Sequence, residues 1–482
     1  MKNNNYDFVI FGAKGDLSRR KLFPALYKLE NKKMLYKKTK IIGVGRINWT
    51  KNDFSKFVKK SLKKFLIEKI NKNTWNNLKN RLTFCNLDIC DTKNFYKLKK
   101  KIKKNKIIIN YFAIPSNLYS KICKGLYKFN LNLKNSRIVL EKPIGNSFST
   151  SKKINKKIGK YFEESQIFRI DHYLGKDTII NLLYLRFTNS IFYNNWNNKS
   201  IDHVQITIAE KIGIEGRNEY FNKTGQTKDM FQNHILQILT IITMKEPKKI
   251  NSKNIRKEKI KILKKLHFIK EKEIHKKTAI GQYSYGKINN IKLSSYNSEI
   301  LEKKNSNTET FVSIRVDIKN KTWKGVPFYI RTGKRLPKKC SKIVIVFKNT
   351  TPKIFDKFSD FINNKLVIYL EPNERIYLKF LNKIPSLNKK CKLKSSKMYF
   401  KYSKTFKNKN IPDSYEKLLL ECILGDQSLF VHVDEVKYSW KWIDNIINIW
   451  KKVSKKSELY LSGTWGPSLS KKIIERDGRK WI

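Results

Sequence analysis

Eight consecutive residues, RIDHYLGK at positions 169–176, concentrate groups that can take part in chemistry. They provide two cations, an imidazole, a phenol and a carboxylate, from Arg169, Lys176, His172, Tyr173 and Asp171. Adjacent cationic groups can clamp a phosphate ester, and a carboxylate can orient a base from elsewhere in the fold. Gly175 permits a close backbone approach, and a helix beginning near it would add amide donors. The segment predicts an anion clamp; the alternative is a solvated junction between a strand and a helix.

A candidate for that base is His234, within a helical pattern predicted over residues 227–244. A histidine is suited to accept a hydroxyl proton near neutral pH. Asp229 lies five residues earlier, about 140° around an α-helix, so both side chains can border one pocket without touching each other. The alternative is a structural histidine that only donates or accepts a hydrogen bond. Of the five other histidines, His172 belongs to the clamp, and four have no comparable surroundings in the sequence: His203, His267, His275 and His432.

The segment GAKGDL at positions 12–17 lies where a first predicted strand, residues 6–12, is followed by a first predicted helix, residues 16–29. Glycines at such a turn let backbone N–H groups approach a pyrophosphate, and the helix N-terminus favours its negative charge. The common GxGxxG spacing is not reproduced, and an ordinary glycine-containing turn is the alternative. The turn nevertheless predicts a dinucleotide site that includes Gly12, Lys14, Gly15, Asp16 and Leu17.

The second predicted strand, residues 40–46, ends in GVGR and therefore in Arg46. Sites that prefer NAD usually carry an acidic residue there to hold the ribose 2′-hydroxyl. An arginine can instead pair bidentately with a 2′-phosphate. We therefore expect NADP, with a plain surface charge as the alternative role of Arg46.

Strands and helices alternate over the first 170 or so residues, which is typical of a parallel sheet covered on both faces. Further on, strands follow one another and favour an antiparallel sheet. We expect an α/β Rossmann-like domain over residues 1–174 and a larger α+β domain, with a mostly antiparallel sheet, over residues 175–482. The predicted strands after the second are residues 82–87, 107–114, 137–142, 201–209, 308–318, 325–332, 342–348, 365–370 and 375–381. Residues 251–305 are Lys-rich with poor periodicity.

The formal net charge of +66 raises the hypothesis of nucleic-acid binding. Only 15 of the 105 basic residues are Arg, and the 90 Lys are spread over the whole length with abundant Asn and Ile. AT-rich codons favour these three residue types together, so base composition accounts for the charge. We expect no specific nucleic-acid partner.

The chain has no apolar run of roughly 18 residues, so no membrane span is expected. Its first residues do not resemble a signal peptide. The six cysteines show no CxxC pair, which is typical of reduced thiols in a cytoplasm. No metal site is expected.

Several motifs together resemble the glucose-6-phosphate dehydrogenase family, and its bacterial type closely, over essentially the whole chain. The most specific is RIDHYLGK. The others are GAKGDLSRRKLFPALYKL at 12–29, GVGR at 43–46, INYFAIP at 109–115, EKPIG at 141–145, AEKIGIEGR at 209–217, DMFQNHILQ from 229, NTETF at 307–311, GVPFYIRTGKRLP at 325–337 and SGTWGP at 462–467.

The resemblance implies oxidation of D-glucose 6-phosphate at C1 to 6-phospho-D-glucono-1,5-lactone with reduction of NADP⁺, the first step of the oxidative pentose phosphate pathway. It implies His234 as the general base and Asp171 as the residue that orients it. His172, Tyr173 and Lys176 match the phosphate-binding positions.

Further substrate contacts are implied for Lys142, Glu210, Asp229, Lys334 and Lys339. Lys142, Ala113 and Pro115 match positions beside the cofactor, and the peptide before Pro143 is expected to be cis. The chain departs from the family at Lys14, Ser116, Lys228 and Glu371, where relatives usually have Ser or Thr, Pro, Arg and Gln respectively. Glu371 puts a neutral amide contact to the sugar in doubt.

Family members assemble through the large sheet of the second domain, so we expect a homodimer or homotetramer. The sequence leaves open which of the two forms, and whether a second, structural nucleotide binds. Two other functions are considered: another NADP-dependent sugar dehydrogenase, and a polyanion-binding protein that has lost catalysis. Retention of the charged residues that the reaction requires argues against such a loss.

Overall fold

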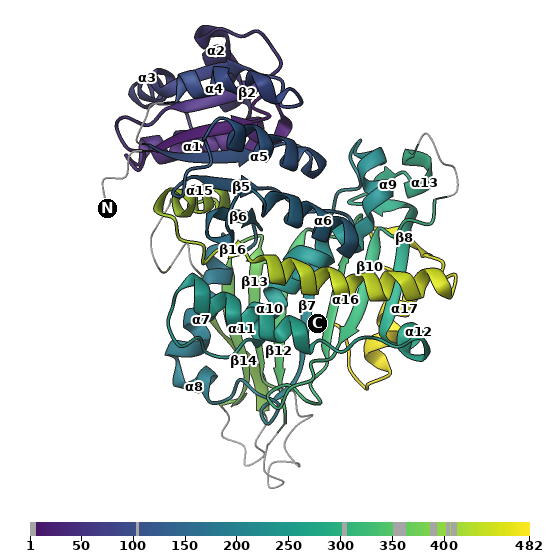
Figure 1. Ribbon diagram of the computed structural model, residues 1–482. Helices are drawn as coiled ribbons and strands as arrows, with labels where there is room; N and C mark the ends of the chain where they lie inside the picture. The colour runs from purple at the N-terminus through teal and green to yellow at the C-terminus, as the bar shows by residue number, and fades with distance from the viewer. Residues whose placement is uncertain are drawn as a thin grey trace. The chain divides into compact units, whose positions relative to one another are not determined.

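The computed structural model describes residues 6–102, 106–300, 306–349, 363–385, 393–401, 405 and 412–482. The chain divides into two compact units (Figure 1). Unit 1 comprises Met1–Lys176, Pro247–Lys257 and Pro412–Trp440. Unit 2 comprises Asp177–Glu246, Glu258–Ile411 and Lys441–Ile482. Unit 1 thus includes two late segments in addition to the N-terminal one.

Unit 1 is built on a seven-stranded sheet with the order β16-β6-β5-β4-β1-β2-β3. Strands β1 to β6 are parallel to their neighbours, and only β16 is antiparallel to β6. The order 3-2-1-4-5-6 is that of a doubly wound nucleotide-binding sheet. The strands are β1 Tyr6–Phe11, β2 Ile41–Gly45, β3 Leu82–Asn86, β4 Ile107–Phe112, β5 Arg137–Leu140, β6 Ile167–Ile170 and β16 Phe430–Val431.

Helices cover both faces of this sheet because its strands are apolar on both sides. Phe8 and Ile10 of β1 belong to one buried cluster, with side chains of α1, α2, α3 and α15. Val9 and Phe11 belong to the opposite cluster, with side chains of α4, α5 and α6. The helices are α1 Phe23–Asn31, α2 Lys51–Phe65, α3 Lys72–Arg81, α4 Phe95–Lys101, α5 Tyr119–Lys128, α6 Phe148–Ile158 and α15 Ser414–Leu424.

Unit 2 is built on a ten-stranded sheet with the order β15-β14-β13-β12-β7-β11-β10-β8-β17, and β9 pairs with β8. Two pairs are parallel, β7 with β11 and β8 with β17; the other pairs are antiparallel. The strands are β7 Ile201–Ala209, β8 Thr278–Ile288, β9 Ile291–Leu293, β10 Phe311–Val316, β11 Phe328–Gly333, β12 Cys340–Phe347, β13 Lys365–Glu371, β14 Arg375–Lys383, β15 Leu393–Lys401 and β17 Glu458–Ser462.

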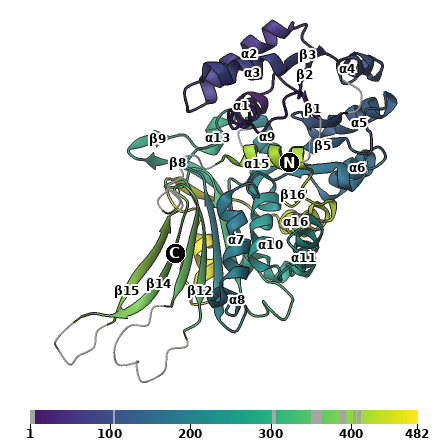
Figure 2. The same cartoon turned by 90° about the vertical axis from the view of Figure 1, so that its left-hand side faces the viewer.

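Helices α7 and α10 lie on one face of the unit 2 sheet, and β14 and β15 form one of its margins (Figures 1 and 2). A π-helix, η5, directly precedes α10. The helical elements are α7 Asp177–Thr188, α8 Ser190–Tyr193, α9 Asn218–Gln226, η5 Thr227–Ile235, α10 Leu236–Thr243, α12 Ile274–Lys277, α13 Tyr296–Glu299 and α17 Ser468–Glu475. Two longer helices, α11 Ser252–Lys265 and α16 Val433–Lys452, begin in unit 1 and end in unit 2.

The predicted fold class is confirmed: a Rossmann-like N-terminal region and a larger α+β region with a mostly antiparallel sheet. The segment without clear periodicity contains α11 and the long strand β8. The helix predicted over residues 227–244 is present, but its first nine residues form the π-helix η5.

Among the described residues, five cysteines are free, and Cys391 lies outside those residues. In the same part of the chain, no helix has both the length and the apolar character needed to cross a membrane, and no group of three or more His, Cys, Asp or Glu is placed to hold a metal ion.

We predict that Glu421 makes unit 1 less stable at alkaline pH. Burial at the end of α15, together with the nearby charge of Asp426, raises the pKa of the Glu421 carboxyl to about 7. Because the folded protein binds this proton more tightly than the unfolded chain, Glu421 contributes to the free energy of unfolding. This contribution is complete below the ordinary pKa of about 4.3 and is lost as the pH rises through about 7. Glu421→Gln should therefore raise Tm at pH 8.5 by about 2–4 °C and change it little near pH 5.

Thermal unfolding of both proteins at the two pH values measures this difference. Glu68→Gln, at an exposed position, is the matched control and should show the same Tm change at both pH values. A Glu421→Gln protein whose advantage is equal at both pH values would contradict the assignment.

Candidate active site

The nucleotide turn connects β1 to the first helical segment of unit 1. Gly12 has φ +85°, and the N–H groups of Gly12 and Ala13 both donate to the Val44 carbonyl at 3.2 Å. The Gly15 N–H donates to the Gly12 carbonyl at 2.9 Å, and the Ser18 hydroxyl donates to the same oxygen at 3.0 Å. A Cβ on Gly12 would lie 2.4 Å from the Ala113 carbonyl oxygen. The turn therefore requires glycine, because the Ala113 carbonyl occupies the space that a side chain would need.

This turn lies at the topological switch point of the sheet. β1 has β2 on one side and β4 on the other, so their carboxyl ends lie together. Ala113, just after β4, donates its N–H to the Phe11 carbonyl at 2.9 Å, and Pro115 is exposed two residues later. Open α/β sheets bind ligands at this position. Residues predicted for the cofactor from two distant parts of the sequence are thus brought to one edge of the sheet.

Three charged residues predicted near the cofactor are exposed, namely Lys14, Asp16 and Arg46. Arg46 directly follows β2, and Lys14 lies within the turn. Asp16, at the start of the helical segment, pairs with Arg20 one turn later at 2.7 Å. The residue after the second strand is thus a cation, in a position where a 2′-phosphate would be accommodated.

The predicted anion clamp forms a tight turn after β6. The Tyr173 N–H donates to a carboxylate oxygen of Asp171 at 3.0 Å, and the Lys176 N–H donates to the Tyr173 carbonyl at 3.1 Å. The His172 and Tyr173 rings are 5.0 Å apart, and the Lys176 ammonium lies 5.1 Å from the Tyr173 ring centre. The structure therefore brings the four predicted residues together on one turn.

The surroundings of this turn differ from a solvated junction. Asp171 and Tyr173 are buried, with exposed fractions of 2% and 6%. The His172 ring stacks on Tyr415 of α15, with 6.4 Å between the ring centres. A Cβ on Gly175 would lie 2.8 Å from the Ser414 carbonyl, so the close approach that Gly175 permits is to its own chain. Helix α7 then begins at Asp177, close to the predicted position.

Lys142 follows a buried carboxylate that the sequence did not single out. Glu141 accepts a hydrogen bond from the Tyr111 hydroxyl at 2.5 Å and lies 3.4 Å from the Tyr415 hydroxyl. The Tyr119 hydroxyl donates to the Glu141 backbone carbonyl at 2.9 Å. Burial raises the pKa of Glu141, and the tyrosine hydrogen bonds oppose that shift. The next peptide bond, Lys142–Pro143, is cis, as the resemblance implies.

In unit 2, Glu210 and Lys334 form a second pair of predicted residues. They follow the ends of β7 and β11, whose last residues, Ala209 and Gly333, are register partners. The Lys334 ammonium donates to Glu210 at 2.8 Å, and the Lys334 side chain is fully buried. The parallel pairing of the two strands therefore positions this ion pair.

Asp229 and His234 lie on η5. Both are buried, His234 completely and Asp229 with an exposed fraction of 9%. The π-helix joins residue i to residue i+5 by its hydrogen bonds, so the two residues are one turn apart. The α-helical separation of about 140° expected from the sequence is therefore wrong. π-Helical segments occur frequently at functional sites.

Lys339, also predicted to contact substrate, forms an ion pair with Glu371 at 3.1 Å, and its side chain is 65% exposed. Glu371 is a position at which this chain departs from the family pattern. A lysine predicted for the sugar site is thus paired with the carboxylate that replaces the usual amide.

His203 lies in a hydrogen-bond network that was not predicted from its neighbours in the sequence. Its ring nitrogen Nδ1 lies 2.6 Å from Asp202, and its Nε2 lies 3.0 Å from the Gln205 amide nitrogen. Asp202 in turn accepts two hydrogen bonds from Arg479 at 2.9 and 2.7 Å. Burial lowers the pKa of His203. This network joins Arg479, near the end of the chain, to β7. The adjacent Asp202 and His203 in the sequence could have indicated such a network.

Asp171 belongs to unit 1, whereas His234 belongs to unit 2. Lys142 likewise belongs to unit 1, and Glu210, Asp229, Lys334 and Lys339 belong to unit 2.

We predict that Gly12→Ala destabilises the protein more than a positive φ alone explains. Gly12 and Gly216 both have positive φ, +85° and +75°, but a Cβ on Gly216 meets nothing within 4 Å. Gly216→Ala should cost about 1–2 kcal/mol of unfolding free energy. Gly12→Ala should cost more and should also raise the KM for the nucleotide, because the Ala113 carbonyl must move. Urea denaturation of both variants measures the difference, and equal losses would contradict the importance of the close contact between Gly12 and the Ala113 carbonyl.

Comparisons with known proteins agree with this architecture. The protein-family model described as "Glucose-6-phosphate dehydrogenase, NAD binding domain" matches residues 9–181, and the family model described as "Glucose-6-phosphate dehydrogenase, C-terminal domain" matches residues 183–482. The chain is 55% identical to the glucose-6-phosphate 1-dehydrogenase of Buchnera aphidicola subsp. Schizaphis graminum, covering 99% of this chain and 98% of that protein. It is 48% identical to the enzyme of that name from Dickeya dadantii, covering 98% and 97%.

A solved structure of glucose-6-phosphate dehydrogenase in complex with its substrate glucose-6-phosphate is also similar. It has a TM-score of 0.91 and 32% identity, and 99% of each chain is covered. The chain described here therefore belongs to the glucose-6-phosphate dehydrogenase family.

Proposed function

We propose that this protein oxidises D-glucose 6-phosphate at C1 to 6-phospho-D-glucono-1,5-lactone and reduces NADP⁺, as the first step of the oxidative pentose phosphate pathway. The observation that carries the proposal is the retained clamp, Asp171 to Lys176, in a chain that matches the family over its whole length. The five free cysteines among the described residues are compatible with a cytoplasmic location. Residues 1–174 would bind the nucleotide, and residues 175–482 the sugar.

Each residue of the proposed catalytic pair has its own role in the reaction. His234 accepts the proton of the C1 hydroxyl while a hydride leaves C1. NADP⁺, when bound at the turn after β1, supplies the hydride acceptor. Asp171 orients the His234 imidazole and stabilises the imidazolium that forms. The complete burial of His234 supports this role, because an imidazole in a low-dielectric site is strongly affected by a nearby carboxylate.

The substrate is held at both ends. His172, Tyr173 and Lys176 bind the phosphate, and their common turn supports that role. Lys142, Glu210, Asp229, Lys334 and Lys339 contact the sugar. Binding energy from the remote phosphate places C1 for transfer, so unphosphorylated glucose should react poorly.

The cofactor is held by backbone and charge. The Gly12 to Leu17 turn receives the pyrophosphate, and its location at the topological switch point of the sheet supports that role. Arg46 binds the 2′-phosphate, and Lys14 adds a cation near the phosphates. Asp16 is engaged with Arg20 and so shapes the helix start. Ala113, Pro115 and Lys142 border the nicotinamide side.

The protein is further proposed to form a homodimer or homotetramer through the large sheet. β15 is an edge strand of the sheet, and Met398 and Tyr399 on it are 64% and 62% exposed. Tyr399 lies 5.6 Å, between ring centres, from Tyr377 of β14. Exposed apolar side chains on an edge strand are typical of an interface.

His234→Asn should lower kcat by about 10²–10⁴-fold, as expected for loss of a general base. The KM for glucose 6-phosphate should change little, because the phosphate clamp is intact. His432→Asn replaces a histidine outside the proposed site and is the matched control. Steady-state assays that follow NADPH absorbance, with glucose as a second substrate, measure both parameters. A His234→Asn enzyme that retains most of its kcat would sink the proposal.

Arg46→Ala should raise the KM for NADP⁺ by roughly 10–100-fold, because charge-assisted hydrogen bonds contribute about 1.5–3 kcal/mol. The KM for NAD⁺, which lacks the 2′-phosphate, should be unaffected. Arg46→Lys keeps the charge without the planar fork and should give an intermediate KM. Equal increases for both nucleotides would show that Arg46 does not select NADP.

A further inference from the structure

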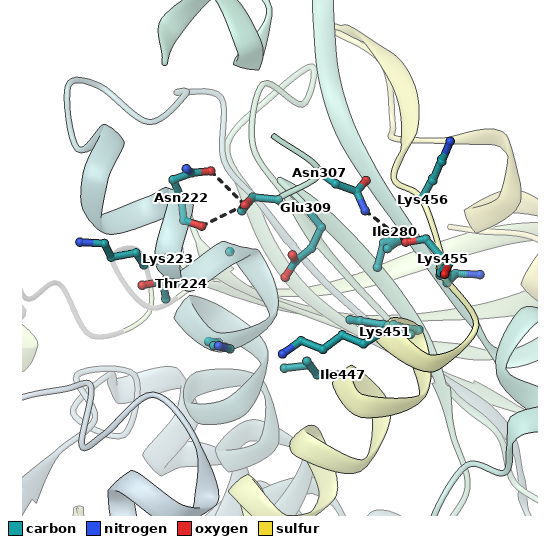
Figure 3. Close-up of a pocket in the computed structure, with 15 residues that line it drawn as sticks. Asn222, Lys223, Thr224, Ile280, Asn307, Glu309, Ile447, Lys451, Lys455 and Lys456 are labelled. Carbon is teal, nitrogen blue, oxygen red and sulfur yellow. Dashed lines mark hydrogen bonds between the residues drawn. The ribbon is translucent and has the colours of Figure 1, made fainter. Parts of the chain in front are cut away.

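A cavity of about 590 Å³ lies in unit 2, outside the residues assigned above to substrate and cofactor. Three segments and the single residue Ile280 of β8 border it; the segments are residues 222–228, residues 307–309, and the end of α16 with the residues that follow, as far as Lys456 (Figure 3). Its volume is that of a small-molecule site. All three segments belong to the same compact unit.

The lining of this cavity is strongly cationic. Five lysines contribute to it, against one carboxylate, that of Glu309; the lysines are Lys223, Lys228, Lys451, Lys455 and Lys456. Lys223 pairs with Glu219 on its own helix at 2.6 Å. In Figure 3, the Lys451 side chain extends beside Ile447 on the side toward which Glu309 points. The cavity therefore has a surplus of positive charge that a small anion would neutralise.

Two features distinguish the cavity from an ordinary lysine-rich surface. Lys455 is largely buried, with an exposed fraction of 9%, and its ammonium lies 3.3 Å from the His275 ring. Burial also lowers the pKa of Lys455. In addition, Ile280, Ile447 and Trp450 give the cavity an apolar wall, and the Trp450 ring is fixed by its hydrogen bond to Thr278 at 2.9 Å. Electrostatic attraction is stronger beside such a wall than in open solvent.

The same cavity borders the start of η5. Glu309 accepts the Thr227 N–H through its side chain at 3.0 Å, and its backbone carbonyl accepts the Gln226 N–H at 2.9 Å. Gly225 has φ +67°, and a Cβ there would lie 2.5 Å from Glu309. Glu309 thus clamps the first residue of the helix that carries Asp229 and His234.

We propose that this cavity binds a small molecule carrying two or more phosphate groups, and that its occupancy is transmitted through Glu309 to η5. An anion beside Glu309 changes the electrostatic environment of the carboxylate that holds Thr227. The binding step stands on the cavity alone. The regulatory step rests on the proposed function, because it assumes that η5 carries the general base.

Binding is tested on the full-length protein by isothermal calorimetry with inorganic tripolyphosphate at about 0.15 M salt, where long-range attraction is screened. Glucose 6-phosphate and NADPH are both present, so that the proposed catalytic sites are filled. The cavity variant is Lys451→Gln with Lys456→Gln. The matched control is Lys264→Gln with Lys265→Gln, two exposed lysines at the end of α11.

We expect one saturable site per chain, a Kd at least tenfold weaker in the cavity variant, and a Kd within about twofold of wild type in the control. Equal weakening in both variants would show diffuse adsorption to a chain of net charge +66 and would overturn the proposal. An unchanged Kd in the cavity variant, or no saturable site in the wild type, would overturn it as well.

A second variant should bind the anion more tightly, which is the opposite of the effect expected for the lysine variant. Glu309→Gln removes the cavity's carboxylate and keeps an oxygen able to accept the Thr227 N–H, so tripolyphosphate should bind about threefold more tightly. Weaker binding by a folded Glu309→Gln protein would contradict an anion at this position.

Amide hydrogen exchange over residues 227–235 tests the coupling. Tripolyphosphate should slow exchange there in the wild type and leave it unchanged in the cavity variant. Unchanged exchange in the wild type would overturn the coupling. Neither calorimetry nor exchange requires turnover, so failure here is distinguishable from failure of the His234 assay.

Discussion

A charged side chain that is buried away from water needs a hydrogen-bonding or oppositely charged partner. Several buried charged residues of the proposed site directly follow the end of a strand and find such a partner there. Lys334 is fully buried and is paired with Glu210 across the ends of two parallel strands. Glu141 is buried after β5 beside tyrosine hydroxyls, and Asp171 is buried after β6 with the Tyr173 N–H. A buried charge held by neighbours that are themselves fixed has little freedom to move. The proposed site is built from such groups.

Sheet topology determines where these strand ends meet. In unit 1 the order 3-2-1-4-5-6 places the ends of β1 and β4 side by side, so that the Gly12 turn and Ala113 share one edge. In unit 2 the parallel pairing of β7 with β11 brings Glu210 to Lys334. Strand direction therefore assembles residues that lie about a hundred positions apart in the chain.

The net charge of +66 is borne mostly at the surface, and the interior uses charge sparingly. Asp7 and Lys106 illustrate the rule, because both are buried and they pair with each other at 2.7 Å. Surface lysines are spread over helices such as α2 and α11. The cavity beside η5 is different, since its lysines surround a hollow with an apolar wall.

Much of the fold and of the candidate site could be predicted from local patterns and motifs. Apolar runs predicted β1 and β2, and the glycine-containing segment after the first of them predicted a turn at the end of β1. These inferences succeeded because the interactions concerned lie within a few residues along the chain. Strand β8 was not predicted, because its segment lacked clear periodicity.

Residue patterns along the chain were enough to identify the family, to locate most strands of the two sheets and to name the residue types available for chemistry. Only the folded structure shows that α15 packs within unit 1 and stacks Tyr415 on His172. It also shows that Gly175 must lack a side chain, because the Ser414 backbone approaches it closely. It also decided that η5 is a π-helix, and that Lys339 pairs with Glu371. Helix and strand patterns depend on residues that are close together in the sequence. The contacts named here join segments that are far apart in the sequence and become neighbours only after folding, so local patterns cannot predict them.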